Sequence, residues 1–196
     1  AVDLLIVSLK APHLEAGLAQ APARFLERGL VLPRLNGTGH LEILREHFGP
    51  RVAAGTIGLI EAFREDPVTI VHRSPGALIE MGADEAALAD PISHCAKLFE
   101  SAGLQAQVLQ SEARVLWSKL SRLAPLAAIT AASGMPLGVC RETQPWRDLL
   151  ERAVGEAANL ARLEGYAVQA EEILDRIHSL PAKLETSLAR DVAAGR

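Results

Sequence analysis

The chain has 196 residues, of which 49% are hydrophobic and 22% are charged, so it can bury a real core and is not a disordered protein. Its net charge of -4 gives no basic footprint for nucleic acid, and no apolar run reaches membrane-spanning length, so neither nucleic acid nor a membrane is an expected partner. The two cysteines, Cys95 and Cys140, form no CxxC pair, and no histidine lies at zinc-finger spacing. This pattern predicts buried free thiols, no metal site and a cytoplasmic location.

The first part of the chain alternates between apolar runs and helical segments. An unbroken apolar run over residues 4–9 predicts a strand buried on both faces of a parallel sheet. We then expect a helical stretch to about Leu26, a strand over 29–33, a glycine-bearing loop over 35–39 and a helix over 40–48. Thr38 is the expected N-cap region of that helix, with Glu42 pairing back as in a capping box. The alternation predicts an α/β layer in which Lys10 and Asn36 lie at the carboxyl ends of parallel strands, where such sheets bind ligands.

The predicted pattern changes near residue 110. Before it, an antiparallel meander is expected from three segments, 51–62, 67–72 and 77–80, followed by a helix over 85–101 interrupted near Pro91 and a strand over 104–110. After it, only helices are expected, over 111–132, 146–164, 170–179 and from about Lys183. The predicted fold class is therefore α/β followed by all-α.

The helix predicted over residues 111–132 holds the most informative single residue. Lys119 follows a tryptophan and lies at the edge of an apolar stripe, so it is either a snorkelling surface residue or a cation aimed into a cleft. The stripe consists of residues spaced three and four apart: Leu116, Leu120, Leu123, Ala127 and Thr130.

Four stretches, in order and at matching spacing, resemble the ketopantoate reductase (2-dehydropantoate 2-reductase) family. They are residues 3–11 (DLLIVSLKA), 32–40 (LPRLNGTGH) and 116–120 (LWSKL), and more weakly 187–192 (SLARDV) followed by Gly195-Arg196. The resemblance implies an NADP-dependent reductase with its active site in a cleft between two domains. Residues 1–110 would be the remainder of a Rossmann-type NADP-binding domain, and residues 111–196 the helical C-terminal domain.

The resemblance also implies roles for individual residues. The general acid of the family falls on Lys119, cofactor-binding positions fall on Lys10 and Asn36, and substrate-binding positions fall on Ser187 and Asn36. The chemistry agrees, because hydride addition to a ketone builds negative charge on the carbonyl oxygen, which a lysine can stabilise and protonate. The implied partners are a small 2-oxo acid and, in a homodimer, a second copy of the chain.

Three departures from the family pattern keep other interpretations open. Leu123 and Ala127 stand where the family commonly has asparagines, and no GxGxxG turn is present to bind pyrophosphate. The family's glutamate would fall beyond Arg196. We therefore expect either an incomplete copy of a longer protein or a degenerate relative. The alternatives are an oxidoreductase acting on a different 2-oxo acid and a non-catalytic helical interaction protein.

Overall fold

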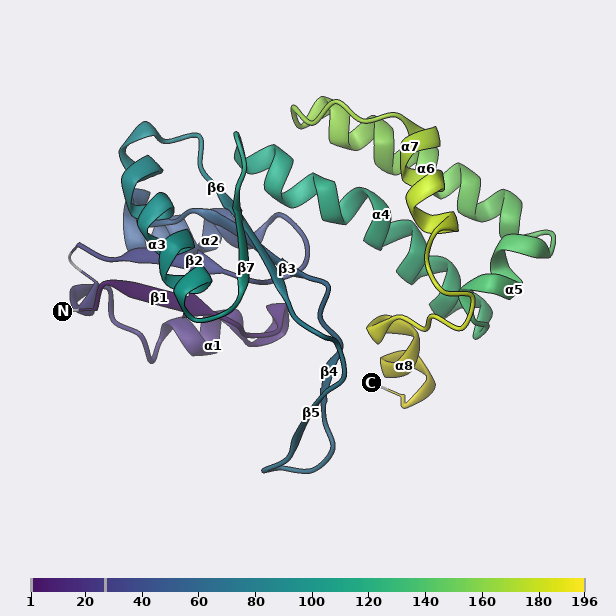
Figure 1. Ribbon diagram of the computed structural model, residues 1–196, viewed down its shortest axis with the longest axis horizontal. Helices are drawn as coiled ribbons and strands as arrows, with labels where there is room; N and C mark the ends of the chain where they lie inside the picture. The colour runs from purple at the N-terminus through teal and green to yellow at the C-terminus, as the bar shows by residue number, and fades with distance from the viewer. Residues whose placement is uncertain (1, 27, 196) are drawn as a thin grey trace. The chain divides into compact units, whose positions relative to one another are not determined.

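The computed structural model describes residues 2–26 and 28–195, and it divides into two compact units (Figure 1). The units are Ala1–Leu116 and Trp117–Arg196. Strands and helices alternate in the first unit, whereas the described residues of the second are helical or irregular. The predicted fold class, an α/β portion followed by an all-α portion, is confirmed.

Two groups of strands form the sheet of the first unit. β1 (Leu4–Val7) and β2 (Leu30–Pro33) are parallel, in the register Leu4↔Leu30 to Val7↔Pro33. β3 (Ala54–Gly58) is antiparallel to β6 (Leu78–Gly82), and β6 is parallel to β7 (Gln105–Val108). A parallel bridge between Val31 and Val52 joins the two groups.

Burial differs between the two parallel strands. Every residue of β2 is buried, as expected for a central strand, whereas β1 is half-buried and Ile6 is 37% exposed. The burial on both faces that was expected for residues 4–9 was therefore wrong for β1, which pairs with β2 alone among the described residues. Gly55 lies where β3 passes β2, and a Cβ atom there would lie 2.5 Å from the Pro33 carbonyl oxygen, so this crossing requires glycine.

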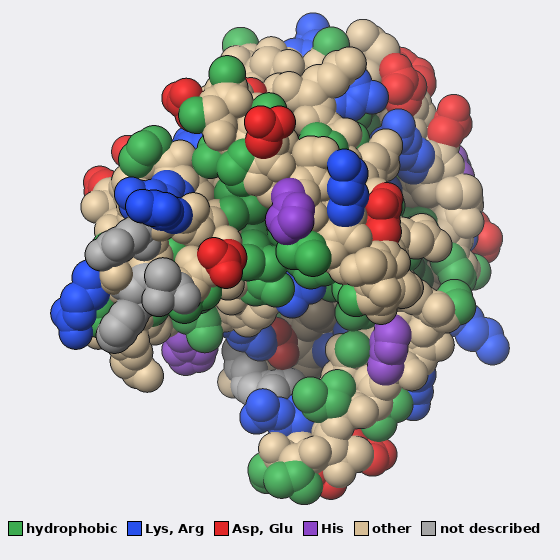
Figure 2. All heavy atoms as spheres, turned by 60° about the vertical axis from the view of Figure 1, so that its left-hand side comes forward, with side chains coloured by type: hydrophobic (Ala, Val, Ile, Leu, Met, Phe, Trp, Pro, Cys, Tyr) green, Lys and Arg blue, Asp and Glu red, His purple; other side chains and the backbone are tan. Residues whose placement is uncertain are grey.

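The expected three-strand meander is replaced by a different pairing. β3 and β6 pair along their whole length, and the chain between them forms a separate hairpin of β4 (Ala62–Arg64) and β5 (Ile70–His72), which projects from the sheet (Figure 1). The Asp66 carboxylate shapes the hairpin turn by accepting hydrogen bonds from the Val68 and Thr69 amides, both at 2.8 Å. A side-chain hydrogen bond from Thr69, together with these amide bonds, lowers the pKa of Asp66. Val68 is 92% exposed, and Figure 2 shows hydrophobic side chains at the tip of this lobe.

Helices cover the sheet of the first unit. They are α1 (Leu14–Leu18), α2 (His40–Phe48) and α3 (Ala89–Ser101), with 3-10 turns at Ala11–His13, Ala23–Phe25, Gly49–Arg51 and Ala86–Leu88. The helical stretch expected to reach Leu26 is thus broken into short pieces. α2 begins after Gly39 with no side-chain cap, because the Thr38 carbonyl, not its hydroxyl, accepts the Leu41 amide at 3.3 Å. The predicted capping box was wrong.

Within the described part of the chain, five helices follow β7. They are α4 (Glu112–Ser133), α5 (Leu137–Glu142), α6 (Trp146–Leu163), α7 (Ala170–His178) and α8 (Ser187–Ala193). α8 begins later than the expected Lys183, because the carbonyls of the residues before it accept hydrogen bonds from the first turn of α5. The carbonyls of Ala182 and Leu184 accept the amides of Gly138 and Leu137 at 2.8 and 3.1 Å, which fixes this segment against the start of α5. No described helix combines the length and hydropathy needed to cross a membrane.

The core of the second unit reveals which helix faces pack. The sequence predicts one apolar side of α6, formed by Leu149, Leu150, Ala153, Ala157, Leu160 and Ala161. Leu150, Ala157 and Ala161 are buried as expected, together with Val154 and Ala158, on a face that packs toward α5 and α7. Leu149 and Leu160 are instead 39% and 53% exposed. On α4 the predicted stripe is only partly buried: Leu116 and Thr130 are buried, whereas Leu120, Leu123 and Ala127 are half-buried. Other buried residues of this helix include Ser121, Leu126 and Ile129. Cys95 and Cys140 are both buried free thiols, as expected.

Candidate functional site

The carboxyl ends of β1 and β2 bring two of the predicted site residues to one edge of the sheet. Lys10 and Asn36 each follow, by three residues, the paired residues Val7 and Pro33. Both are exposed. At the same ends of the two strands, the Arg34 amide donates to the Val7 carbonyl at 2.9 Å, and the Arg34 guanidinium donates to the Ser8 hydroxyl at 3.1 Å. These polar residues lie at one edge because each follows a strand in the sequence, and parallel strands place their carboxyl ends at the same edge of the sheet.

The loop after β2 leaves open space on its outer side. Gly37 has a φ of 91°, a left-handed conformation that favours glycine, and a Cβ atom at Gly37 or Gly39 would meet no atom within 4 Å. The Asn36 amide and the Lys10 ammonium can offer hydrogen-bond donors to a polar ligand on this edge. In residues 2–26 and 28–195, no cluster of three or more His, Cys, Asp or Glu side chains could hold a metal.

A buried histidine and a half-buried arginine flank the same loop, and neither is among the site residues predicted from the sequence. His40, the first residue of α2, is 5% exposed, and neither ring nitrogen has a hydrogen-bond partner among the described residues. Arg34 Nε is likewise buried without one. Burial lowers the pKa of both side chains. The lowered pKa favours the neutral form of the His40 imidazole. The available signal was its position at a helix start beside a glycine loop.

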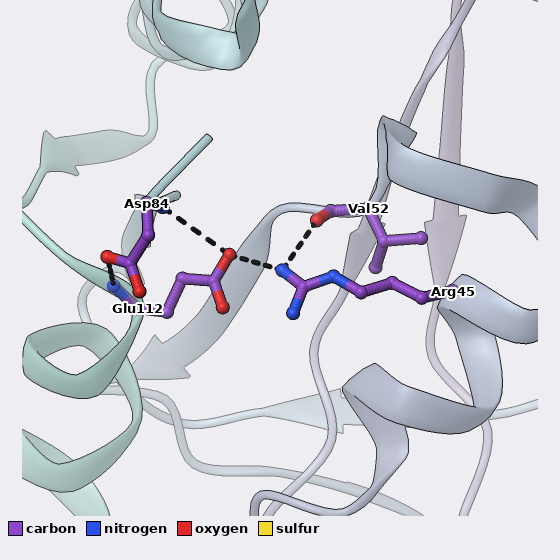
Figure 3. A network of polar contacts seen from close by, with 4 residues as sticks. All are labelled: Arg45, Val52, Asp84 and Glu112. Carbon is purple, nitrogen blue, oxygen red and sulfur yellow. Dashed lines mark hydrogen bonds and ion pairs between the residues drawn. The ribbon is translucent and has the colours of Figure 1, made fainter. Parts of the chain in front are cut away.

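A polar network attaches the first turn of α4 to the rest of the first unit (Figure 3). The Arg45 guanidinium, on α2, pairs with the Glu112 carboxylate and donates to the Val52 carbonyl at 3.2 Å. Glu112 and Asp84 bond reciprocally: the Glu112 amide donates to the Asp84 carboxylate at 3.1 Å, and the Asp84 amide to the Glu112 carboxylate at 3.4 Å. No local pattern could predict this network, because it joins residues far apart in the sequence.

Lys119 lies on α4 about two helical turns after Glu112 and is half-buried. One and two turns further on, Leu123 and Ala127 are half-buried hydrocarbon side chains. The local surroundings of Lys119 on this helix are thus more apolar than the family pattern implies. Lys10 and Asn36 belong to the first unit, whereas Lys119 belongs to the second.

Ser187 also belongs to the second unit, where a buried pair of threonines connects its helix to α4. Thr186, the N-cap of α8, accepts a hydrogen bond from the Ala189 amide at 3.2 Å. The Thr186 and Thr130 hydroxyls lie 2.9 Å apart, and Thr130, on α4, is fully buried. Ser187 itself is exposed at the first position of α8. Sequence analysis placed Thr130 on the apolar face but assigned no function to it or to Thr186.

Known proteins match this chain in sequence and in fold. The 2-dehydropantoate 2-reductase of Halobacterium salinarum is 30% identical over 200 residues, covering 98% of this chain and 64% of that protein. A solved D-mandelate dehydrogenase with NADH and anilino(oxo)acetate matches with a TM-score of 0.87 at 20% identity, over 98% of this chain and 64% of the other. A ketopantoate reductase of the PanE/ApbA family from Ralstonia eutropha JMP134 matches with a TM-score of 0.85 at 20% identity, over 100% of this chain and 64% of the other.

Two family models cover most of the sequence. Residues 1–85 match the model described as ketopantoate reductase PanE/ApbA, and residues 113–196 match the model described as ketopantoate reductase PanE/ApbA C terminal. The chain spans a little less than two-thirds of the length of the relatives it matches. Because the two models occur in their family order and leave only residues 86–112 unmatched, the chain belongs to the ketopantoate reductase family.

Proposed function

We propose that the whole protein is an NADPH-dependent reductase of a 2-oxo acid, of the type that converts 2-dehydropantoate to pantoate. The observation that carries this proposal is the half-buried position of Lys119 on α4, within the part of the chain that matches the family's C-terminal model. The 30% identical relative from Halobacterium salinarum is a 2-dehydropantoate 2-reductase, which supports the same substrate class. Residues 1–110 would complete the cofactor-binding domain, and residues 111–196 would form the helical domain.

In the proposed reaction, the bound cofactor supplies the hydride that adds to the carbonyl carbon of the 2-oxo acid. Lys119 stabilises the negative charge that develops on the carbonyl oxygen and donates its proton to that oxygen. Lys10 and Asn36, at the carboxyl edge of β1 and β2, orient the cofactor, and Asn36 also contacts the substrate. Ser187, at the start of α8, donates or accepts a hydrogen bond with the substrate.

A different 2-oxo acid is the second candidate substrate. Leu123 and Ala127 present hydrocarbon one and two turns after Lys119, and neither can hydrogen-bond a hydroxylated substrate. This observation favours a more apolar 2-oxo acid than 2-dehydropantoate. Cytoplasmic location and a homodimer remain predictions. The third interpretation, a non-catalytic interaction protein, predicts no turnover of any 2-oxo acid.

The decisive experiment replaces Lys119 with Ala in the whole protein and measures kcat, NADPH affinity and melting temperature together. If Lys119 is the general acid, kcat should fall by about 10²–10⁴-fold. NADPH affinity should change little, because the lysine acts on the carbonyl oxygen and not on the cofactor phosphates. Lys183→Ala is the matched control, since it removes an exposed lysine from the same unit.

A near-normal kcat in Lys119→Ala would remove the catalytic assignment. A melting temperature that falls together with kcat would point instead to loss of folding, and Lys119→Arg would then separate the two effects, because it keeps the long cationic side chain. Phenylglyoxylate serves as a more apolar 2-oxo acid. Its reduction by the wild-type protein, without reduction of 2-dehydropantoate, would favour the second candidate substrate. No activity on either would favour the third interpretation.

A further inference from the structure

The short helix that presents Ser187 is held in an unusual way. None of the seven residues of α8 is buried, so hydrophobic burial within the helix does little to fix its position. A helix this short is also marginal without support from its surroundings. Its N-cap, Thr186, is by contrast only 6% exposed. The attachment of α8 therefore depends heavily on the residue immediately before Ser187.

A continuous chain of hydrogen bonds runs from α8 through Thr186 to α4. The Thr130 hydroxyl donates to the Leu126 carbonyl at 2.8 Å, so its single proton is used there. The Thr186 hydroxyl must then donate across the 2.9 Å contact to Thr130 Oγ1. Thr186 Oγ1 in turn accepts from the Ala189 amide at 3.2 Å. Each hydroxyl donates once and accepts once, so this buried chain is fully satisfied and directional.

We propose that Thr130 and Thr186 are positioning residues that fix Ser187 relative to α4, the helix that carries Lys119. This inference rests on the proposed function, in which Ser187 contacts the 2-oxo acid. An apolar pair could fill the same space, but it would not fix the position of α8 relative to α4. A hydroxyl chain of this kind has one good geometry and therefore selects one position for the first turn of α8.

The test is a double-mutant cycle in the whole protein with Thr130→Val and Ser187→Ala. Thr130→Val preserves shape but breaks the chain, and we expect the KM for the 2-oxo acid to rise about 3- to 10-fold, the loss typical of one hydrogen bond. Affinity for NADPH should stay unchanged, and Thr130→Ser should restore the KM. In the Ser187→Ala background, Thr130→Val should add less than about twofold, because it acts through the residue already removed.

Hydrogen exchange of the α8 amides gives a readout that does not depend on activity. Thr130→Val should speed exchange at Ala189 and its neighbours, whereas the control Thr143→Val, which removes an exposed hydroxyl bonded to the Val139 carbonyl, should not. Unchanged exchange in Thr130→Val would overturn the inference, as would a full KM effect in the Ser187→Ala background. If Thr130→Val speeds exchange but the wild-type protein reduces no 2-oxo acid, the proposed function is refuted, whereas the anchoring of α8 remains supported.

Discussion

His40 allows a sharp test of the polar environment beside Asn36. Its two ring nitrogens are buried and have no partner among the described residues. A buried polar group without a partner costs about 1–3 kcal/mol. We therefore expect His40→Leu, which removes both nitrogens and keeps an apolar side chain of similar reach, to leave the free energy of unfolding at pH 7.5 unchanged or to raise it by about 1–2 kcal/mol.

The pH dependence gives the same test a second readout. Burial lowers the pKa of His40 below its ordinary value of 6.5, so the unfolded chain binds a proton more readily than the folded chain. The contribution of His40 to the free energy of unfolding is thus fully present above about pH 6.5. It is lost as the pH falls from there toward the lowered pKa. If His40 stays neutral in the folded state, the loss between pH 7.5 and 5.5 is at most about 1.4 kcal/mol, an upper limit that solvent screening would reduce. His40→Leu should remove this loss.

Urea unfolding at the two pH values measures both effects, with His47→Leu as the matched control. His47 lies on the same helix, and its ring nitrogen lies 3.0 Å from the Ala21 carbonyl oxygen, so its replacement should destabilise by about 0.5–1.5 kcal/mol. The reasoning would be refuted if His40→Leu destabilised the protein by as much as His47→Leu. It would also fail if the free energy of unfolding of the wild type and of His40→Leu had the same pH dependence.

Two further predictions concern other residues. Leu123→Asn in the whole protein should raise kcat/KM for 2-dehydropantoate by about 2- to 10-fold if the added amide bonds a substrate hydroxyl, and steady-state kinetics that show no gain would argue for the more apolar substrate. The native protein should react slowly with a thiol reagent at Cys95, because the side chain is buried and burial raises the thiol pKa; both conditions suppress the reactive thiolate. Rapid modification at neutral pH, followed by mass spectrometry, would contradict this expectation.

The sequence by itself determined the order and type of the main elements. The apolar run at β2, the alternation with α2 and the change to helices at α4 all follow from local periodicity, which reports whether a segment has a face to bury. The position of Lys10 and Asn36 at one sheet edge also follows, because parallel strands place their carboxyl ends together. Family membership was accessible too, since several short stretches preserved their order and spacing.

Only the tertiary structure decided which faces and partners those elements use. Periodicity could not show that β3 pairs with β6 across an intervening hairpin, or that α6 buries Val154 while Leu160 stays exposed. Those choices depend on the neighbouring elements, whose positions no local window contains. The Arg45–Glu112 pair and the Thr130–Thr186 contact join residues 67 and 56 positions apart. Such contacts form because folding brings distant segments together, and burial then makes each unsatisfied polar atom costly enough to fix their geometry.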